Sequence, residues 1–201
     1  MLILGHVGIA LGATQICEAA CNRLPSRRIG AALRVVDYRF LALGAILPDL
    51  IDKPLAWLIL PDLLEATRSI GHGLILSTVL LAAGYISNRR KRGNLILSLA
   101  MGCLSHLVLD GMWGEPQTLL WPAFGWEFAA RERQGLDRYF PHLWGYPWLA
   151  ASDIIGGLIL GHLVVSLTMR RRLKEFFRRG CQPRVRSAPD KLGTEEPLIA
   201  E

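Results

Sequence analysis

The chain has 201 residues, of which 51% are hydrophobic and 20% are charged, and its mean hydropathy is +0.30. This composition is too apolar for an ordinary soluble domain and excludes an intrinsically disordered protein. The formal charge of +6 at pH 7 would indicate a nucleic-acid partner only if the basic residues formed a patch on a soluble fold, and four irregularly spaced cysteines exclude a disulfide scaffold.

Five mainly apolar stretches recur along the chain, each close to the ~20 residues that span a bilayer as a helix. They are Leu2–Cys21, Phe40–Leu60, Ile70–Ser87, Leu95–Trp113 and Leu149–Met169. We therefore predict an all-α, polytopic membrane protein with about five transmembrane helices. Pro48 and Pro54, with charged residues between them, predict a break in the second helix. The first stretch contains His6, Gln15 and Glu18, so it is expected either to be sheltered by other helices or to lie in the interface.

Basic residues are concentrated after the first, third and fifth stretches. Residues 22–39 hold five arginines, residues 89–92 hold four basic residues, and nine more lie from Arg170 to Lys191. With five spans these segments share one side, which the positive-inside rule makes the cytoplasm. The amino terminus is then expected outside and the carboxyl terminus in the cytoplasm. This topology explains the positive charge by itself, so no nucleic-acid partner is expected.

Two segments differ in composition from the spans. Residues 114–148 are rich in aromatic residues, and five of the six tryptophans lie between Trp113 and Trp148. This extracytoplasmic segment is interpreted as an interfacial aromatic belt or as a lid over a site at the outer surface. Residues 1–172 are predicted to form a helical membrane domain that includes this segment. Residues 173–201 are predicted to be a basic juxtamembrane segment with a disordered cytoplasmic tail.

Six ionisable residues fall in the outer halves of the predicted spans, where such groups are costly unless they are paired, hydrated or bound to a metal. They are His6, Asp49, Asp52, His72, His106 and Asp110. The spacing puts the last two residues on one helical face, and likewise the two aspartates of the second span. Three imidazoles and three carboxylates at one depth are expected to bind a divalent metal, with zinc the default for this ligand set.

Each of these residues also has a structural interpretation. A single histidine at a helix end is often only a polar end residue, and Asp49 could form an ion pair with Lys53 at a kink. Asp153, near the outer end of the fifth stretch, is either a partner of the site or a helix-start residue. His162, deep in the same stretch, is interpreted as a packing or hydrogen-bonding histidine. The convergence of six groups is what favours a functional site.

Five segments occur in a fixed order along the chain: Gly5-His6, GAILPDLIDKP (44–54), RSIGHGL (68–74), LSHLVLDGMW (104–113) and LLWP (119–122). In these segments the sequence resembles the YdjM-like family of predicted membrane-bound metal-dependent hydrolases, also described as LexA-binding and inner-membrane-associated. The resemblance implies a helical metal site distantly similar to that of zinc-dependent phospholipases C. It also implies a bacterial inner-membrane location.

Carried onto this chain, the resemblance implies that the metal and catalytic residues are His6, Asp49, Asp52, His72, His106 and Asp110. Asp49 or Asp52 would be the general base. The chain departs from the commoner family pattern at two points: these two aspartates are one residue further apart, and Thr67 replaces the first histidine of a further motif.

The sequence therefore predicts a membrane-bound metal-dependent hydrolase with its site at the extracytoplasmic headgroup level. The expected partners are membrane lipids and a lipid-like phosphoester substrate. Two alternatives stay open. The same residues could carry ions or protons across the membrane, or the protein could be an interaction module that holds a soluble cytoplasmic partner through residues 180–201.

Overall fold

The structure is a computed structural model that describes residues 3–23, 36–59, 68–90, 93–126, 128 and 147–180. Every regular element in these ranges is a helix, which confirms the predicted all-α fold. Within them, two helices are long and apolar enough to cross a membrane: α1 (Ile3–Arg23), through its residues Ile3–Ala20, and α9 (Pro147–Met169). The apolar helices α5 (Leu74–Arg89) and α6 (Leu95–Leu109) are shorter. The number of membrane crossings therefore stays a prediction.

The remaining elements are short. They are α3 (Tyr38–Gly44), α4 (Leu47–Pro54), the π-helical turn η1 (Leu55–Ile59), the 3-10 turns η2 (Ile70–His72) and η3 (Met112–Gly114), α7 (Pro116–Leu119) and α10 (Leu173–Arg179). Two of them, α3 and α4, together with η1, occupy the second predicted span. Helix α10 was not predicted, and residues 181–201, the predicted disordered tail, lie outside the described residues.

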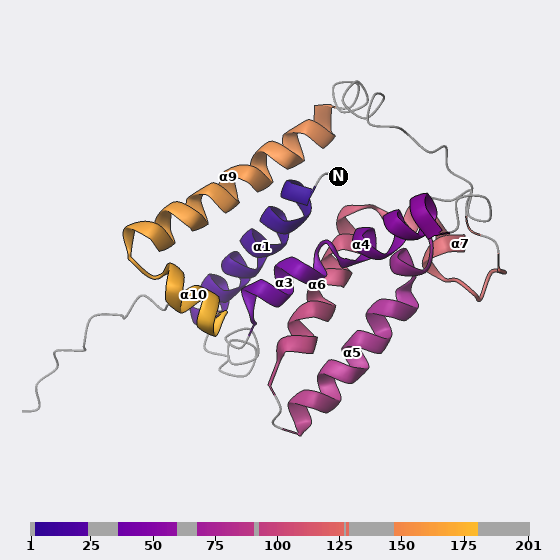
Figure 1. The fold of residues 1–201 in the computed structure, drawn as a ribbon, viewed down its shortest axis with the longest axis horizontal. Helices are drawn as coiled ribbons and strands as arrows, with labels where there is room; N and C mark the ends of the chain where they lie inside the picture. Colours follow the sequence, from indigo (N-terminus) through magenta and orange to yellow (C-terminus); the bar gives the residue numbers. More distant parts are fainter. Residues whose placement is uncertain are drawn as a thin grey trace, which may run out of the picture.

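Helices α1 and α9 lie side by side and run in the same direction (Figure 1). The backbone N–H of Gly5 donates to Asp153 at 2.7 Å, and one turn later Gly8 faces Gly156. A methyl group on either glycine would overlap the backbone of the other helix. The two helices can therefore pack this closely only because both positions lack a side chain.

The second predicted span contains the expected break, at Ala45 and Ile46 rather than at a proline. Pro48 occupies the second position of α4, where its missing N–H would have had no helical partner. Pro54 lies inside α4 and is followed directly by the π-helical turn η1. Such a turn is a common way for a helix to absorb a local disruption.

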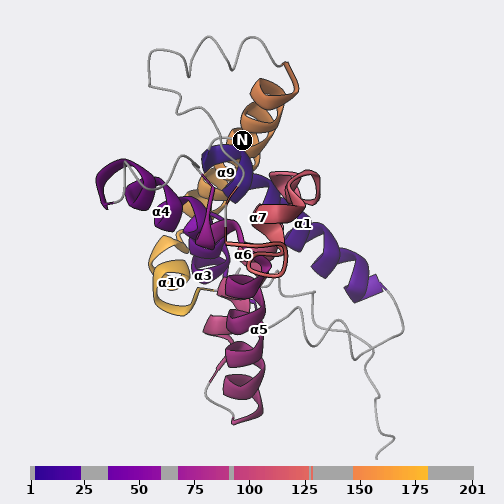
Figure 2. The same ribbon diagram turned by 90° about the vertical axis from the view of Figure 1, so that its right-hand side faces the viewer.

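Helix α6 is flanked by α3, which runs parallel to it, and by α5, which runs antiparallel (Figures 1 and 2). Gly44 of α3 and Gly102 of α6 lie where these two helices touch, and a methyl group on either would overlap the other helix. Gly84 of α5 packs against the backbone of Leu97 in the same way. Close contact between α3 and α6 brings the break at Ala45 next to the last turns of α6.

A buried cluster joins α1, α3 and α9. Its members are Leu11, Val36, Tyr38, Leu41, Leu163 and Leu167. Outward faces of the helices carry large apolar side chains instead, among them Val79, Leu158 and Met169, which are 59%, 68% and 80% exposed. An apolar outer surface of this kind suits contact with lipid. His162 of α9 is also exposed, so it does not pack in the interior, and the alternative of a hydrogen-bonding histidine stays a prediction.

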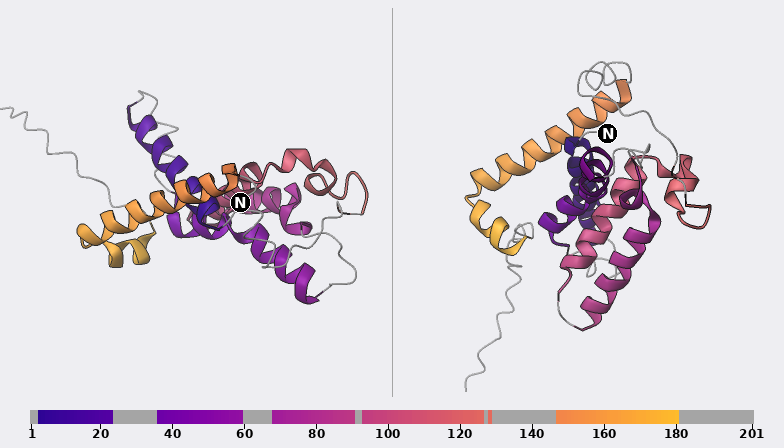
Figure 3. Two further views of the ribbon diagram at one scale, coloured as in Figure 1. Left: turned by 90° about the horizontal axis from the view of Figure 1, so that it is seen from above. Right: turned by 45° about the vertical axis from the view of Figure 1, so that its right-hand side comes forward.

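The described part of the chain begins among the packed helices, with the start of α1 beside α9 (Figure 3). Trp113, Phe124 and Trp126 of the aromatic segment are largely exposed, and residues 129–146 of that segment lie outside the described residues. At the other end, α10 folds back against α3, where the N–H of Tyr38 donates to the carbonyl oxygen of Gly180 at 2.7 Å.

Candidate metal centre

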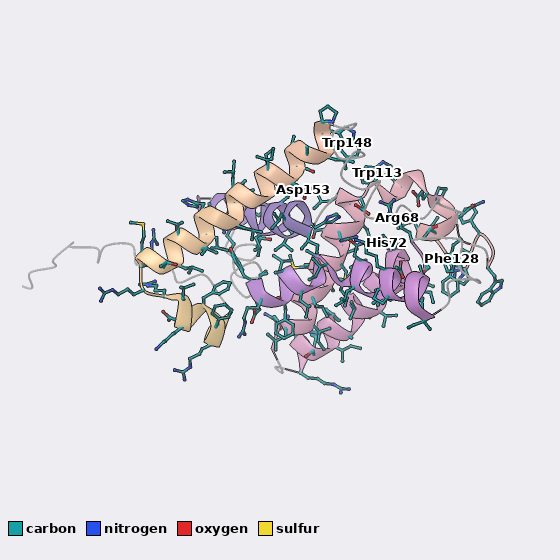
Figure 4. All side chains as sticks on the ribbon, turned by 45° about the horizontal axis from the view of Figure 1, so that its top comes forward. Arg68, His72, Trp113, Phe128, Trp148 and Asp153 are labelled. Carbon is teal, nitrogen blue, oxygen red and sulfur yellow. The ribbon has the colours of Figure 1, made fainter. Side chains whose placement is uncertain are left out.

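The structure brings the six predicted residues together where the start of α1, the start of α4, the turn η2 and the end of α6 meet (Figure 4). The three histidines and Asp52 are at most 1% exposed. Three pairs lie within hydrogen-bonding distance: His6 with Asp110, which are 104 positions apart in sequence, His72 with Asp52, and His72 with His106. The convergence expected from their depth is therefore present in the fold.

His72 is oriented by Asp52. Its Nδ1 lies 2.7 Å from Oδ2 of Asp52, and the same carboxylate accepts hydrogen bonds from Ser69 and from the backbone N–H groups of Gly71 and His72. A carboxylate that accepts this many bonds is stabilised in its ionised form, so Nδ1 of His72 carries the proton and donates. Nε2 of His72 then points toward the centre.

His106 is oriented by the break between α3 and α4. Its Nδ1 lies 2.7 Å from the carbonyl oxygen of Ala45, which sits at the C-cap of α3, where carbonyls lack partners within their helix. Because a carbonyl oxygen can only accept, Nδ1 of His106 also carries the proton. The break in the second predicted span thus supplies the acceptor that orients this histidine.

The two Nε2 atoms of His72 and His106 lie 3.2 Å apart. With both protons held on Nδ1, two lone pairs face each other in a buried place, which is unfavourable without a positive charge. A proton on one ring or a metal ion bound by both rings would remove the repulsion. Metal-binding histidines typically donate their other N–H to a carboxylate or a backbone carbonyl, as these two do.

The third histidine and two carboxylates surround this pair. The ring of His6 stacks on that of His106 at 4.1 Å, and its Nε2 lies 3.0 Å from Oδ1 of Asp110. Oδ2 of Asp110 and Oδ1 of Asp49 each lie 3.7 Å from Nε2 of His72. Two groups of ligand atoms within 4.8 Å result, His6 with His106 and Asp110, and Asp49 with His72 and His106. Either group could hold a metal ion.

The side chains around the centre favour a divalent cation. Among the described residues, the acidic side chains that contact the histidines or their partners are Asp49, Asp52, Asp110 and Glu115. Their cationic partners are Lys53, 2.7 Å from Asp49, and Arg68, 2.5 Å from Asp110. Carboxylate oxygens and imidazole nitrogens gathered in a buried place are a donor set that divalent cations bind. The residues present therefore fit a divalent metal.

Asp52 and Asp49 differ in their surroundings, although both were predicted as metal ligands and as general bases. Asp52 belongs to neither metal-capable group, and both of its oxygens are engaged with residues 69–72. Asp49 belongs to one group, its side chain is 19% exposed, and it forms the ion pair with Lys53 that the sequence also allowed. Thr67, the other point of departure, lies outside the described residues.

Two further residues lie beside the six: Arg68, for which the sequence suggested no role, and Asp153, for which it left two roles open. Arg68 bridges Asp110 and Glu115 and lies four residues before His72, a proximity in sequence that could have indicated its place. Asp153 accepts the N–H of Gly5 from within the second turn of α9, and so holds the residue next to His6. Of the two roles left open for Asp153, partner of the site fits this contact, and helix start does not.

Comparison with known proteins gives one match. The family model described as "YdjM inner membrane protein" matches residues 1–175, which confirms the family resemblance found in the sequence. Searches of the curated proteins and of the solved structures found no match.

Proposed function

The chain belongs to the YdjM inner membrane protein family, and on that premise we propose that it is a metal-dependent hydrolase of the inner membrane that acts on a lipid-like phosphoester. One observation carries the proposal. Nε2 of His72 and Nε2 of His106 face each other at 3.2 Å, with both rings held by acceptors at Nδ1. This arrangement is typical of histidines that share a metal.

In the proposed site, His6, His72, His106, Asp49 and Asp110 hold the metal, and zinc is our preferred identity for this donor set. When bound, the metal supplies Lewis acidity toward water and toward an oxygen of the substrate. Asp52 positions His72 through its bond to Nδ1. Asp49 is the proposed general base, because its partly exposed carboxylate is open to a water molecule.

Relative helix directions support five crossings, and the positive-inside rule supports an amino terminus on the outside. In a chain of five alternating spans, the first and fifth run in the same direction, as do the second and fourth, while the third is antiparallel to the fourth. The contacts show these directions: α1 runs parallel to α9, α3 runs parallel to α6, and α5 runs antiparallel to α6. On this topology the metal centre lies toward the outer ends of the helices.

A substrate at headgroup level is supported by exposure around the centre. The histidines are buried, whereas Asp49, Arg68 and Glu115 are 19%, 17% and 25% exposed, so a ligand would approach over these three side chains. Trp113, in the turn that follows α6, is 69% exposed. Exposed tryptophans favour the boundary between lipid and water.

Metal analysis of the purified protein tests the proposal. Wild type is expected to contain a divalent metal in stoichiometric amount, and His72→Ala and His106→Ala are expected to lose most of it. His162→Ala is the matched control, since His162 is an exposed histidine on α9. Wild type without metal, or full metal in both site variants, would show that the centre is not a metal site. A hydrolysis screen with micellar lipid phosphoesters follows for the metal-loaded protein.

An ion carrier with the same residues is the less supported function. A pathway would need a continuous line of polar groups beyond the centre, but the described interior there includes Leu11, Leu41 and Cys103. The buried hydroxyl groups of Thr14 and Ser98 are bonded to helix carbonyls. The third function, binding of a soluble cytoplasmic partner through residues 180–201, concerns a segment that is almost wholly outside the described residues. Removing that segment should abolish such binding and leave hydrolysis intact.

A further inference from the structure

Arg68 lies close to His72 (Figure 4) and is the more exposed of the two side chains. Its NH2 group is 2.5 Å from Oδ2 of Asp110, and its NH1 group is 3.0 Å from Oε1 of Glu115. The side chain is 17% exposed, while His72 beyond it is fully buried. The guanidinium group therefore occupies the edge of the centre over which a ligand would approach.

Metal binding would weaken one of the two ion pairs of Arg68 and leave the other unchanged. Asp110 belongs to a metal-capable group, so a metal would draw its negative charge away from the guanidinium group. Glu115 belongs to neither group and can keep NH1 in place. A guanidinium group has five N–H donors in a planar fork, which matches the oxygens of a phosphoryl group. Glu115 thus holds Arg68 in place, while the charge that Asp110 no longer neutralises becomes available for a phosphoryl group.

Lys53 is the other cation beside the centre, and it fits this task less well. It is 54% exposed and forms its ion pair with Asp49 at 2.7 Å, one helical turn away in α4. An ammonium group at such an exposed place is strongly hydrated and binds as a point charge. The burial of Arg68, its fork of donors and its link to Asp110 single it out.

We propose that Arg68 binds the phosphoryl oxygens of the ligand beside the metal and that Glu115 positions the guanidinium group for this task. This inference rests on the proposed function, since it assumes the same centre. The shared chemistry is a phosphoryl group, which either a lipid headgroup or a free phosphate can present.

Binding of inorganic phosphate tests the inference without any assay of hydrolysis. Protein in dodecyl maltoside is loaded with Zn²⁺ and dialysed to equilibrium against radiolabelled inorganic phosphate, and the metal content of each sample is measured in parallel. The variants are Arg68→Gln, Arg68→Lys and Glu115→Gln. Arg89→Gln is the control, because Arg89 is an exposed arginine at the far end of α5. A second arm adds phosphatidic acid to the micelles as a competitor.

Wild type is expected to bind phosphate, and Arg68→Gln to bind it about tenfold more weakly or worse, the usual effect of losing a charge-assisted contact. Arg68→Lys should fall between them because it keeps the charge but loses the fork. Glu115→Gln should also weaken binding, whereas Arg89→Gln should leave it unchanged, and all variants should keep their metal. Competition by phosphatidic acid would assign the site to a lipid headgroup, and its absence to a free phosphate.

Equal phosphate affinity in wild type and Arg68→Gln would overturn the inference and leave the proposed metal centre standing. Loss of metal from Arg68→Gln would also overturn it, because Arg68 would then serve only to hold Asp110. If wild type contains no metal, the proposed function fails and so does binding beside a metal; phosphate binding that still falls in Arg68→Gln would then support only the phosphoryl-binding role of Arg68.

Discussion

Asp52→Asn replaces one carboxylate oxygen with an NH2 group of similar size and removes a buried negative charge. The carboxylate accepts five hydrogen bonds, three at Oδ2 and two at Oδ1, with distances from 2.6 to 3.2 Å. The amide keeps more hydrogen bonds when its NH2 group replaces Oδ1, since Oδ2 accepts three bonds and Oδ1 two. The hydroxyl of Ser69 can then turn and accept from the NH2 group, but the N–H of Gly71 can only donate. At least one donor then faces a donor, and four other bonds lose their charge assistance.

Removing one partner from a buried charged network costs about 3–5 kcal/mol of unfolding free energy. For a chain of this length that corresponds to a fall in Tm of roughly 6–20 °C. Metal affinity should fall by about 10- to 100-fold as well, because Asp52 orients His72. Thermal unfolding in detergent with a chelator present measures the loss of stability separately from metal binding. Metal titration measures the loss of metal affinity.

Asp49→Asn is the matched control, since it removes a charge from the same helix at a more exposed place. An ion pair of this kind with Lys53 contributes less than about 1 kcal/mol, so the Tm of the chelated protein should barely change while metal affinity falls. If Asp52→Asn unfolds at the temperature of wild type, the bonds of Asp52 do not hold residues 69–72 in place, and the argument for its positioning role fails.

Three further predictions concern packing, topology and the metal. Gly8→Ala should lower the Tm of the protein, because a methyl group would overlap the backbone of Gly156, whereas Gly161→Ala, in open space on α9, should keep or raise it; equal effects would refute the close packing of α1 on α9. A reporter fused after Trp126 should behave as extracytoplasmic and one fused after Met169 as cytoplasmic, and the reverse would refute the proposed orientation. Metal at a concentration 100 times its dissociation constant should stabilise the folded protein by about 2.7 kcal/mol, so a chelator should lower the Tm of wild type but leave that of His106→Ala unchanged.

The sequence predicted the helical class, the break in the second span and the six polar residues that meet at one depth. The mean hydropathy and charge of a segment do not depend on which helices pack against one another, so they can be read before the fold is known. Depth in the membrane follows from position within a segment, which is why His6 and Asp110, far apart in the chain, were expected at one level. The structure has them 3.0 Å apart.

The partners of each polar atom depended on tertiary structure. The acceptor for His106 is the carbonyl of Ala45, and it lies there because Gly44 and Gly102 let α3 and α6 pack closely. The hydropathy and charge of the individual segments do not predict the contact between His106 and Ala45. The same holds for Asp52, whose spacing from Asp49 suggested two equivalent ligands, whereas its oxygens are taken up by residues 69–72.

By itself, the sequence determined which segments are apolar, which of them are followed by basic residues and where polar residues lie within them, because these are local properties of the chain. Only the tertiary structure decided which acceptors face Nδ1 of His72 and of His106, the separate surroundings of Asp49 and Asp52, and the place of Arg68 at the edge of the centre. Those features depend on hydrogen bonds of fixed length and direction between distant residues, and such bonds exist only once the helices have packed.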